Sequence, residues 1–308
     1  MPSPAPNFLH RFGDFWVNLI LTGIIRGVLA LPYHIRVPMT GWIVSRVIAP
    51  LAGYNKRVRN NLAYVWPDLP ESEVARLCRA VPDNAGRTMI EIYSGAEFTR
   101  RIADVTPKGP GLAALDQAHA DGRPIILVSG HFGNYDAFRS AIHQRGHTVG
   151  ALYRDMNNAQ FNDHYVKAMN SIAQPMFVRG RRGLAEMVKF LRGGNTVALL
   201  SDQYYGQGKV ITFFGKPTPA ATSAAEMALK YDALLLPIYG IRQPDGLSFE
   251  VIVEDAVPHT DAVTMMQHLS DSLEARVRAH PEQWLWIHKR WKPEMAEQDA
   301  RRHLPKSE

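Results

Sequence analysis

The chain has a single cysteine, Cys78, among its 308 residues. One thiol excludes an internal disulfide framework. Cys78 lies among helix-forming residues in ESEVARLCRAV, where we expect it to pack rather than to react. The scarcity of cysteine also indicates that the protein works in, or faces, a reducing compartment.

Several signature motifs are missing as well. There is no HExxH motif and no cysteine pair, and the four-residue spacing of His143 and His147 is interrupted by Gly146, which predicts a helix end, so we expect no metal site. Neither GxGxxG nor GxxxxGK[ST] occurs, which argues against a nucleotide cofactor. Ser129 lacks the GxSxG context of a hydrolase nucleophile, because position 127 is leucine.

Low-complexity tracts are absent, and 46% of the residues are apolar while 21% are charged. This composition is typical of a folded protein with one large or two modest domains. The net charge of +6 permits nucleic acid, anionic lipid or acidic protein partners. The basic cluster RGRR at 179–182 shows no aromatic interleaving and belongs to no nucleic-acid module, so we expect no nucleic-acid partner.

No long apolar run is free of polar residues. The stretch FWVNLILTGIIRGVLALP from Phe15 has a membrane-spanning length, but Asn18 and Arg26 interrupt it, and no signal-peptide cleavage pattern follows. A second apolar stretch, GWIVSRVIAPLAGY, precedes the basic KRVR at 56–59. The pattern predicts a membrane-associating region, either a surface anchor or a shallow insertion; a pair of buried helices is the alternative.

Helical patterns dominate residues 1–108, with Pro82 predicted to separate two amphipathic helices. The segment VTPKGPG at 105–111 has the composition of a linker. We therefore predict a helical N-terminal region at 1–108 and a second domain at 109–308.

Strand and helix patterns alternate in the second domain. Short apolar runs predict strands at 124–129, 147–154, 174–180, 195–202, 233–242 and 247–254. The segments between most of these runs, and the segment 264–280 after the last, have helical patterns. This order predicts an α/β fold with a largely parallel central sheet flanked by helices.

The motif HFGNYD follows the first predicted strand and combines His131, Gly133, Asn134 and Asp136. Each polar residue has an ordinary interpretation, since Asn134 suits a helix N-cap and Asp136 a first helical turn. Together they predict a bend at Gly133 that brings the Asp136 carboxylate to one nitrogen of His131. The other nitrogen could then accept a proton from a substrate hydroxyl, as a general base. Because no protein nucleophile is evident, direct transfer is favoured over a covalent intermediate.

Three further residues follow predicted strands, as His131 does: Arg154, Arg179 and Asp202. Sites in open α/β sheets gather at the carboxyl ends of strands, which predicts one shared site. The arginines would suit a phosphate or carboxylate, although a solvated turn also explains the RGRR cluster.

Five sequence blocks occur in order: HFGNYD; YR at 153–154; VRGRRGL with SDQYYGQG; FFGKPTPAATSAAEMALKYDALLLPIY; and PEQWLWIHKRWK. With these blocks, the chain resembles the bacterial lipid A biosynthesis (lauroyl/myristoyl) acyltransferase family, firmly over 120–293. The family often has tryptophan where this chain has Tyr135, a difference that bears on substrate choice.

The resemblance implies a glycerolipid acyltransferase-like fold at the cytoplasmic face of the inner membrane. The enzyme would move a fatty acyl chain from acyl carrier protein to a hydroxyl of a lipid A precursor, an anionic lipid, without a cofactor. His131 would be the base and Asp136 its partner. The substrate-binding residues would be Gly133, Asn134, Arg154, Arg179, Asp202 and Gln203. Acylation of another glycolipid or a lyso-lipid, thioester hydrolysis, and a non-enzymatic binding role are the alternatives.

Overall fold

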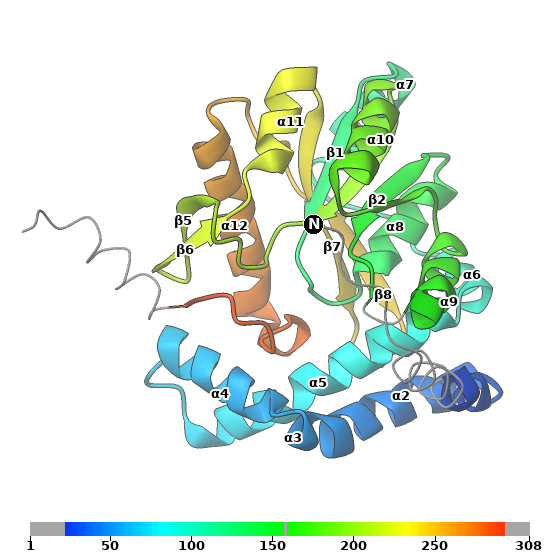
Figure 1. Cartoon of the computed structure of the whole chain (residues 1–308), viewed down its shortest axis with the longest axis vertical. Coiled ribbons are helices and arrows are strands. Elements are labelled where there is room, and N and C mark those ends of the chain that lie inside the picture. Colours follow the sequence, from blue (N-terminus) through cyan, green and yellow to red (C-terminus); the bar gives the residue numbers. More distant parts are fainter. Residues whose placement is uncertain (1–21, 157–158, 293–308) are drawn as a thin grey trace, which may run out of the picture.

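The computed structural model describes residues 22–156 and 159–292 and contains a six-stranded sheet flanked by helices (Figure 1). The strand order is β3-β2-β4-β1-β7-β8. The strands are β1 (Ile125–Ser129), β2 (Val149–Tyr153), β3 (Met176–Val178), β4 (Thr196–Leu200), β7 (Leu234–Arg242) and β8 (Phe249–Val253). The predicted fold class is confirmed.

The central strands run parallel. β1 pairs in parallel with β4 and β7, and β2 with β3 and β4, whereas β8 pairs antiparallel with β7. Ser129 of β1 lies opposite Leu200 of β4, so the residues that follow these two strands emerge side by side. This is the edge where ligand sites of open α/β sheets form.

Alternate residues of β1 face two separate cores because side chains along a strand point to opposite faces of the sheet. Ile125 and Leu127 pack with α8, and Ile126 and Val128 pack on the face of α10, α11 and α12. Burial on both faces explains why β1 is a continuous apolar run. The helices of this part are α7 (Leu112–Ala120), α8 (Tyr135–Gln144), α9 (Ala159–Asn170), α10 (Arg181–Arg192), α11 (Ser223–Tyr231) and α12 (Ala262–Ala279).

The N-terminal helices cross one end of the sheet domain as a separate layer (Figure 1). They are α2 (Tyr33–Ile43), the π-helix η1 (Val44–Ile48), α3 (Ala49–Leu51), α4 (Tyr54–Val65), α5 (Glu71–Tyr93) and α6 (Ala96–Ile102). Within the described residues, none of the helices has the length and apolar character needed to span a bilayer. Residues 15–21 of the first predicted apolar segment lie outside the described residues.

The expected break at Pro82 is wrong, because α5 continues through this residue. Proline removes one helical hydrogen bond and crowds the preceding turn, so an isolated helix would bend or end here. In α5, Leu77, Cys78 and Val81 are buried against aromatic residues of the C-terminal segment. This tertiary packing outweighs the local propensity.

The Pro- and Gly-rich segment 105–111 runs along β8. The Lys108 N–H donates to Val251 O at 3.0 Å, and the Val253 N–H donates to Lys108 O at 2.8 Å. The predicted linker therefore extends the hydrogen bonding of the sheet edge. The division at residue 108 stays a prediction.

A two-stranded hairpin, β5 (Lys209–Phe213) and β6 (Lys216–Ala220), was not evident in the sequence. Two prolines, Pro217 and Pro219, obscure β6, yet a two-stranded ladder tolerates proline where an N–H is not needed. Phe214 and Gly215 both have positive φ, 54° and 67°, as a tight two-residue hairpin turn requires.

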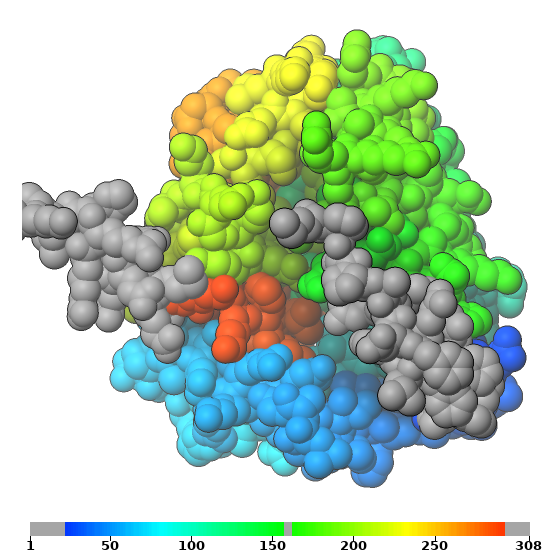
Figure 2. Space-filling model, in the orientation of Figure 1, coloured from blue at the N-terminus to red at the C-terminus, as the bar shows by residue number. Residues whose placement is uncertain are grey.

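The C-terminal segment, from the short helix η2 (Pro281–Gln283) to Lys292, fills the space between the N-terminal helices and this hairpin (Figure 2). Its Trp284, Trp286 and Trp291 are at most 5% exposed and pack with Phe213 of β5. One aromatic cluster thus joins three segments that are distant in the sequence.

Candidate active site

His131 lies two residues after β1, at the carboxyl edge of the sheet. The chain turns at Gly133, whose φ is +55°, and a Cβ at this position would lie 2.0 Å from Gly240 O. Only glycine fits such a backbone approach. Asn134 then caps α8, because its side-chain oxygen accepts the Asp136 N–H at 2.9 Å. The predicted bend is confirmed.

Asp202 is the carboxylate that contacts His131. Its Oδ1 lies 2.7 Å from His131 Nδ1, and its Oδ2 accepts the main-chain N–H of His131 at 2.8 Å. The Trp284 Nε1–H donates to the same Oδ2, also at 2.8 Å. A buried carboxylate with three donors is fixed in place, and it leaves Nε2 as the imidazole nitrogen that can exchange a proton.

The charges of this pair stabilise each other. Burial opposes protonation of His131, but the charge and hydrogen bond of Asp202 together outweigh it and raise the pKa of the imidazole. Burial would raise the pKa of Asp202, but the charge of His131 and the hydrogen bonds from His131 and Trp284 hold this pKa well below its usual range. Asp202 is therefore ionised wherever His131 titrates.

Asp136 does not take the place predicted for it. Its Oδ1 pairs with Arg139, one turn along α8, and its buried Oδ2 has no hydrogen-bond partner among the described residues. The side chain is 1% exposed, and burial raises its pKa despite the adjacent guanidinium. The expected hydrogen bond between Asp136 and the imidazole is therefore wrong. Side chains five residues apart diverge here because Asp136 already belongs to the first turn of α8.

Asn134 and Asp136 thus both support the start of α8. The Asn134 amide donates to Glu91 of α5 at 2.7 Å, and Glu91 forms a two-point ion pair with Arg242 of β7, at 2.5 and 2.7 Å. Asn134 is fully buried, so its side chain serves this network rather than a substrate. Thr88 of α5 donates to Gly133 O at 3.0 Å, which ties the same helix to the turn.

A cavity of about 190 Å³ has His131 in its wall. One side is lined by α5, through Val81, Ala85 and Met89 among others. Gly133 and Tyr135 of the motif also line it, as do Met156, Tyr165 and Leu285. The lining is mostly apolar, with a few polar groups at the His131 end, which is typical of a ligand site.

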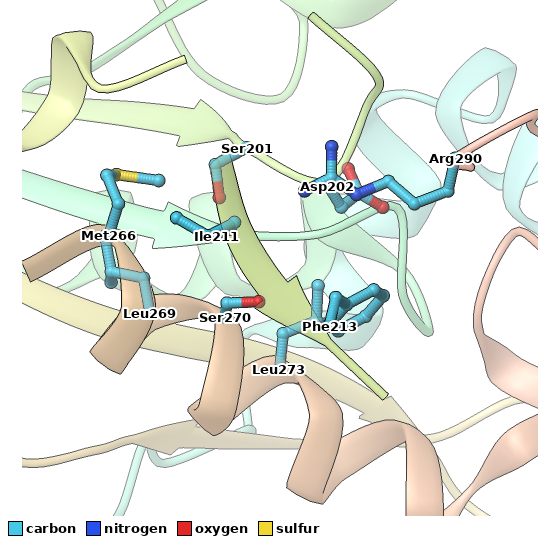
Figure 3. A pocket seen from close by; sticks show the side chains of 9 residues that line it. All are labelled: Ser201, Asp202, Ile211, Phe213, Met266, Leu269, Ser270, Leu273 and Arg290. Carbon is cyan, nitrogen blue, oxygen red and sulfur yellow. The ribbon is translucent and has the colours of Figure 1, made fainter. Parts of the chain in front are cut away.

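A second cavity lies behind Asp202 and has a volume of only about 10 Å³ (Figure 3). This is room for about one water molecule at most, so it is not a substrate site. Arg290 points toward Asp202 here, and its guanidinium donates to Gln203 O at 2.7 Å. Burial lowers the pKa of Arg290 to about 10, so the group is still a cation near neutral pH. The Gln203 amide nitrogen lies 3.5 Å from His131 Nε2, beside the free face of the base.

Arg154 and Arg179 lie at the same sheet edge but farther from His131. They follow β2 and β3, and β4 separates these strands from β1. Both side chains are exposed, and neither is part of the cavity lining in the described part of the chain. The structure therefore brings together His131, Asp202 and Gln203, and leaves the two arginines exposed outside the described cavity lining.

Sequence reasoning missed Trp284, Glu91 and Arg242. The block PEQWLWIHKRWK carried a signal for Trp284, since so many aromatic residues at the end of a chain predict packing against an established site. The sequence carried no comparable signal for Glu91 or Arg242, because each looks like an ordinary charged residue of its own helix or strand. Within the described residues, no cluster of three or more His, Cys, Asp or Glu side chains could hold a metal ion.

Comparison with known proteins supports the family resemblance that the sequence blocks indicated. A family profile described as bacterial lipid A biosynthesis acyltransferase matches residues 5–293. The lipid A biosynthesis lauroyltransferase of Escherichia coli K12 is 24% identical over 95% of this chain and 96% of its own length. A phosphatidylinositol mannoside acyltransferase of Mycobacterium tuberculosis H37Rv is 24% identical over 83% of this chain and 88% of its own. The lipid A biosynthesis palmitoleoyltransferase of E. coli K12 is 23% identical, with coverages of 92% and 93%.

These matches confirm the resemblance seen in the motif blocks, and they make the chain an acyltransferase of the lipid A or glycolipid type. The profile match over residues 5–293 also extends well beyond the 120–293 region that contains the five blocks. The chain therefore belongs to the bacterial lipid A biosynthesis acyltransferase family.

Proposed function

We propose that this protein transfers a fatty acyl chain from the thioester of acyl carrier protein to a hydroxyl of a lipid A precursor. The observation that carries the proposal is that His131, hydrogen-bonded to Asp202, lies in the wall of a largely apolar cavity. A carboxylate that holds Nδ1–H leaves Nε2 unprotonated, which is the state that a general base needs.

The proposed reaction is direct transfer. His131 Nε2 takes the proton of the acceptor hydroxyl as its oxygen attacks the thioester carbonyl. The tetrahedral oxyanion then collapses, the C–S bond breaks, and the imidazolium returns the proton to the departing thiolate. The Gln203 amide, 3.5 Å from Nε2, is suitably close to donate to the oxyanion. Asp202 orients the ring and stabilises its charge, and Asp136 supports the loop through Arg139.

The cavity supports the assignment of an acyl substrate. The α5 side of its wall is mostly apolar, with Asn84 and Thr88 as the polar exceptions. Burial of methylene groups is favourable by about 0.8 kcal/mol each. The thioester would then sit at the polar end, next to His131. Arg154 and Arg179, exposed at the same edge of the sheet, would contact phosphates of the acceptor lipid or of the carrier's prosthetic group.

The choice of acceptor is the finer part of the proposal. The relatives include lipid A and phosphatidylinositol mannoside acyltransferases at similar identity, so another glycolipid is the alternative acceptor. The family assignment favours lipid A. Comparing the membrane lipids of cells with and without the gene by mass spectrometry would decide, because a missing secondary acyl chain identifies both acceptor and chain length.

The enzymatic test uses purified protein, acyl carrier protein loaded with a fatty acid, and a lipid A precursor in detergent. We expect His131→Ala to abolish acyl transfer, by about 10²–10⁴-fold or more, without changing the melting temperature. Near-normal turnover by this variant would refute the role of His131. Thioester loss at the same rate without any acceptor lipid would instead show a hydrolase.

We also propose that the N-terminal layer binds the cytoplasmic face of the inner membrane. Residues 22–67 contain six Lys and Arg residues but no Asp or Glu. Exposed apolar side chains gather on this layer, with Leu51 at 85% and Trp42 at 57% exposure. The others are Ile24, Ile35, Val47 and Ile48. A basic surface with protruding apolar residues suits the headgroup region of an anionic bilayer. The adjoining helix α5 lines the cavity, which would place the cavity close to the lipid surface.

A further inference from the structure

We propose that Trp284 is a positioning residue that acts on the base through Asp202: its indole N–H fixes the carboxylate that orients His131. This inference rests on the proposed function for its catalytic consequence, but its structural content can be tested separately. Trp284 would not react with the substrate. Through Asp202, Trp284 would fix the orientation of the imidazole and affect the pKa of His131.

Two sets of hydrogen bonds join Trp284 to the pair. The Nε1–H donates to Asp202 Oδ2 at 2.8 Å, the oxygen that also accepts the His131 main-chain N–H. The backbone around Trp284 pairs antiparallel with the motif loop, since Gly133 N–H donates to Gln283 O and Leu285 N–H donates to His131 O. The base and the indole are therefore positioned by the same short ladder, on either side of the carboxylate.

The indole itself has little freedom to move. Trp284 is 1% exposed, and its ring contacts Phe213 at 5.3 Å, Trp286 at 4.7 Å and Trp291 at 6.0 Å between centroids. An indole N–H donates but cannot accept or titrate. A tryptophan in this cage thus offers the carboxylate a donor whose direction and charge do not change with pH.

Removal of this donor has a defined electrostatic consequence. An N–H that is bonded to a carboxylate stabilises its ionised form, so the carboxylate becomes more basic when the bond is lost. A more basic Asp202 favours the imidazolium, and the titration midpoint of His131 should rise. Among the described residues, the other charged or titratable groups that face the pair are Arg290 and His288 of the C-terminal segment, Tyr239 of β7, and Tyr135 of α8, whose ring lies 5.5 Å from that of His131. Burial raises the pKa of both tyrosines, so they stay neutral where His131 titrates. His288 Nε2 accepts the Tyr204 N–H at 3.0 Å, and burial lowers its pKa, so it is neutral near pH 7.

The chain offers a matched control for the experiment. Trp286 belongs to the same aromatic cluster and is fully buried, but its Nε1–H donates to Pro281 O at 2.8 Å. Trp284→Phe and Trp286→Phe each remove one indole N–H and similar ring volume. Packing losses should therefore be alike, and only Trp284→Phe removes a donor from Asp202. Trp284 also lines the cavity, so the titration midpoint of His131 is the measurement that reports the donor separately from a change in the cavity wall.

The first measurement does not depend on acyl transfer. The rate at which diethyl pyrocarbonate modifies His131 is followed against pH by mass spectrometry of the peptide, in the intact protein. We expect one midpoint for the wild type and Trp286→Phe, and a higher midpoint for Trp284→Phe. Equal midpoints for all three proteins would overturn the proposal, whatever the enzyme assay shows.

The second measurement compares the effects of the two variants on kcat and on KM. Loss of an outer hydrogen bond that orients a functional group typically costs about 10–100-fold, and we expect this loss in kcat for Trp284→Phe, with KM changed less than about threefold. Trp286→Phe should keep kcat within about threefold of the wild type. If the midpoint shifts but even the wild type does not transfer acyl chains, the proposed function fails and the positioning by Trp284 stands.

A third measurement covers the case in which Trp284→Phe does not fold. In wild-type protein labelled with ¹⁵N-tryptophan, the indole N–H resonance of Trp284 should titrate with the midpoint of His131, while that of Trp286 should not. A Trp284 resonance that does not change across the His131 titration would also overturn the proposal.

Discussion

His131 has two buried acids in its neighbourhood, and they differ in what they contact. Asp202 bonds to the imidazole, whereas Asp136 pairs with Arg139. We expect Asp202→Asn to lower kcat by about 10²–10⁴-fold, because an amide can donate to Nδ1 and so leave the proton on Nε2, the wrong tautomer for a base. Steady-state acyl transfer with the folded variant measures this effect.

Asp136→Asn, in the first turn of α8, is the variant to compare with Asp202→Asn. It leaves the Arg139 guanidinium buried without a charged partner, which typically costs about 3–5 kcal/mol of unfolding free energy. Urea denaturation measures this loss, and we expect kcat per folded molecule to fall far less than in Asp202→Asn. The opposite order of kcat losses would restore the pairing first predicted from the HxxxxD spacing.

The pH dependence follows from the same pair. A general base must be neutral, so kcat/KM should fall as the pH falls through the pKa of His131. Asp202 raises this pKa, and the acid limb should therefore lie above pH 6.5, the ordinary value for histidine. Asp202 stays ionised throughout, because its own pKa is held low. A limb centred below 6.5 in a pH–rate profile would contradict this electrostatic account.

Among the elements, α5 has two roles. It carries Glu91, which is 0% exposed and binds both Arg242 and Asn134. Glu91→Gln leaves Arg242 without its counter-charge, and we expect a loss of about 3–5 kcal/mol in unfolding free energy by urea denaturation. Glu73→Gln, which removes a mostly solvated ion pair of the same helix, should cost less than about 1 kcal/mol. Equal effects would mean that the buried network does not hold α5 to the motif loop.

The same helix lines the cavity through Ala85. Ala85→Phe would fill part of this space, so we expect the variant to lose activity with long-chain donors more than with short-chain donors. The measurement is kcat/KM over a series of acyl chain lengths. Ala75→Phe, on α5 but outside the described cavity lining, is the control. A uniform loss over all chain lengths would argue that the cavity does not hold the acyl chain.

For the whole molecule, the proposed membrane binding of the N-terminal layer predicts one orientation of the protein on a bilayer. Trp42→Ser with Leu51→Ser removes the two most exposed apolar residues of α2, η1 and α3, and we expect at least about tenfold weaker binding to vesicles containing anionic lipid. Co-sedimentation measures this binding. Val210→Ser, at a 65% exposed apolar residue of β5, should leave binding unchanged. Loss of binding in the control alone would place the membrane surface on the hairpin.

The local sequence determined the strands of the six-stranded sheet and the edge of the sheet at which His131 lies. Apolar runs such as IILVS, the bend at Gly133 and the N-cap at Asn134 are decided within a few residues, because burial on both faces and the turn geometry leave little choice. The strand ends also indicated correctly that His131 and Asp202 lie at one edge. The β5–β6 hairpin and the course of α5 through Pro82 could not be predicted, since packing overrides their local signals.

Only the tertiary structure decided which acid serves the base. Asp136 is five residues from His131, and Asp202 is 71 residues away, yet Asp202 makes the contact because β4 lies beside β1. The start of α8 turns Asp136 toward Arg139 instead. Trp284, 82 residues beyond Asp202, reaches the carboxylate because the C-terminal segment pairs with the motif loop. Sequence spacing fixes such partners only within a single element; between elements, strand order and helix packing determine them.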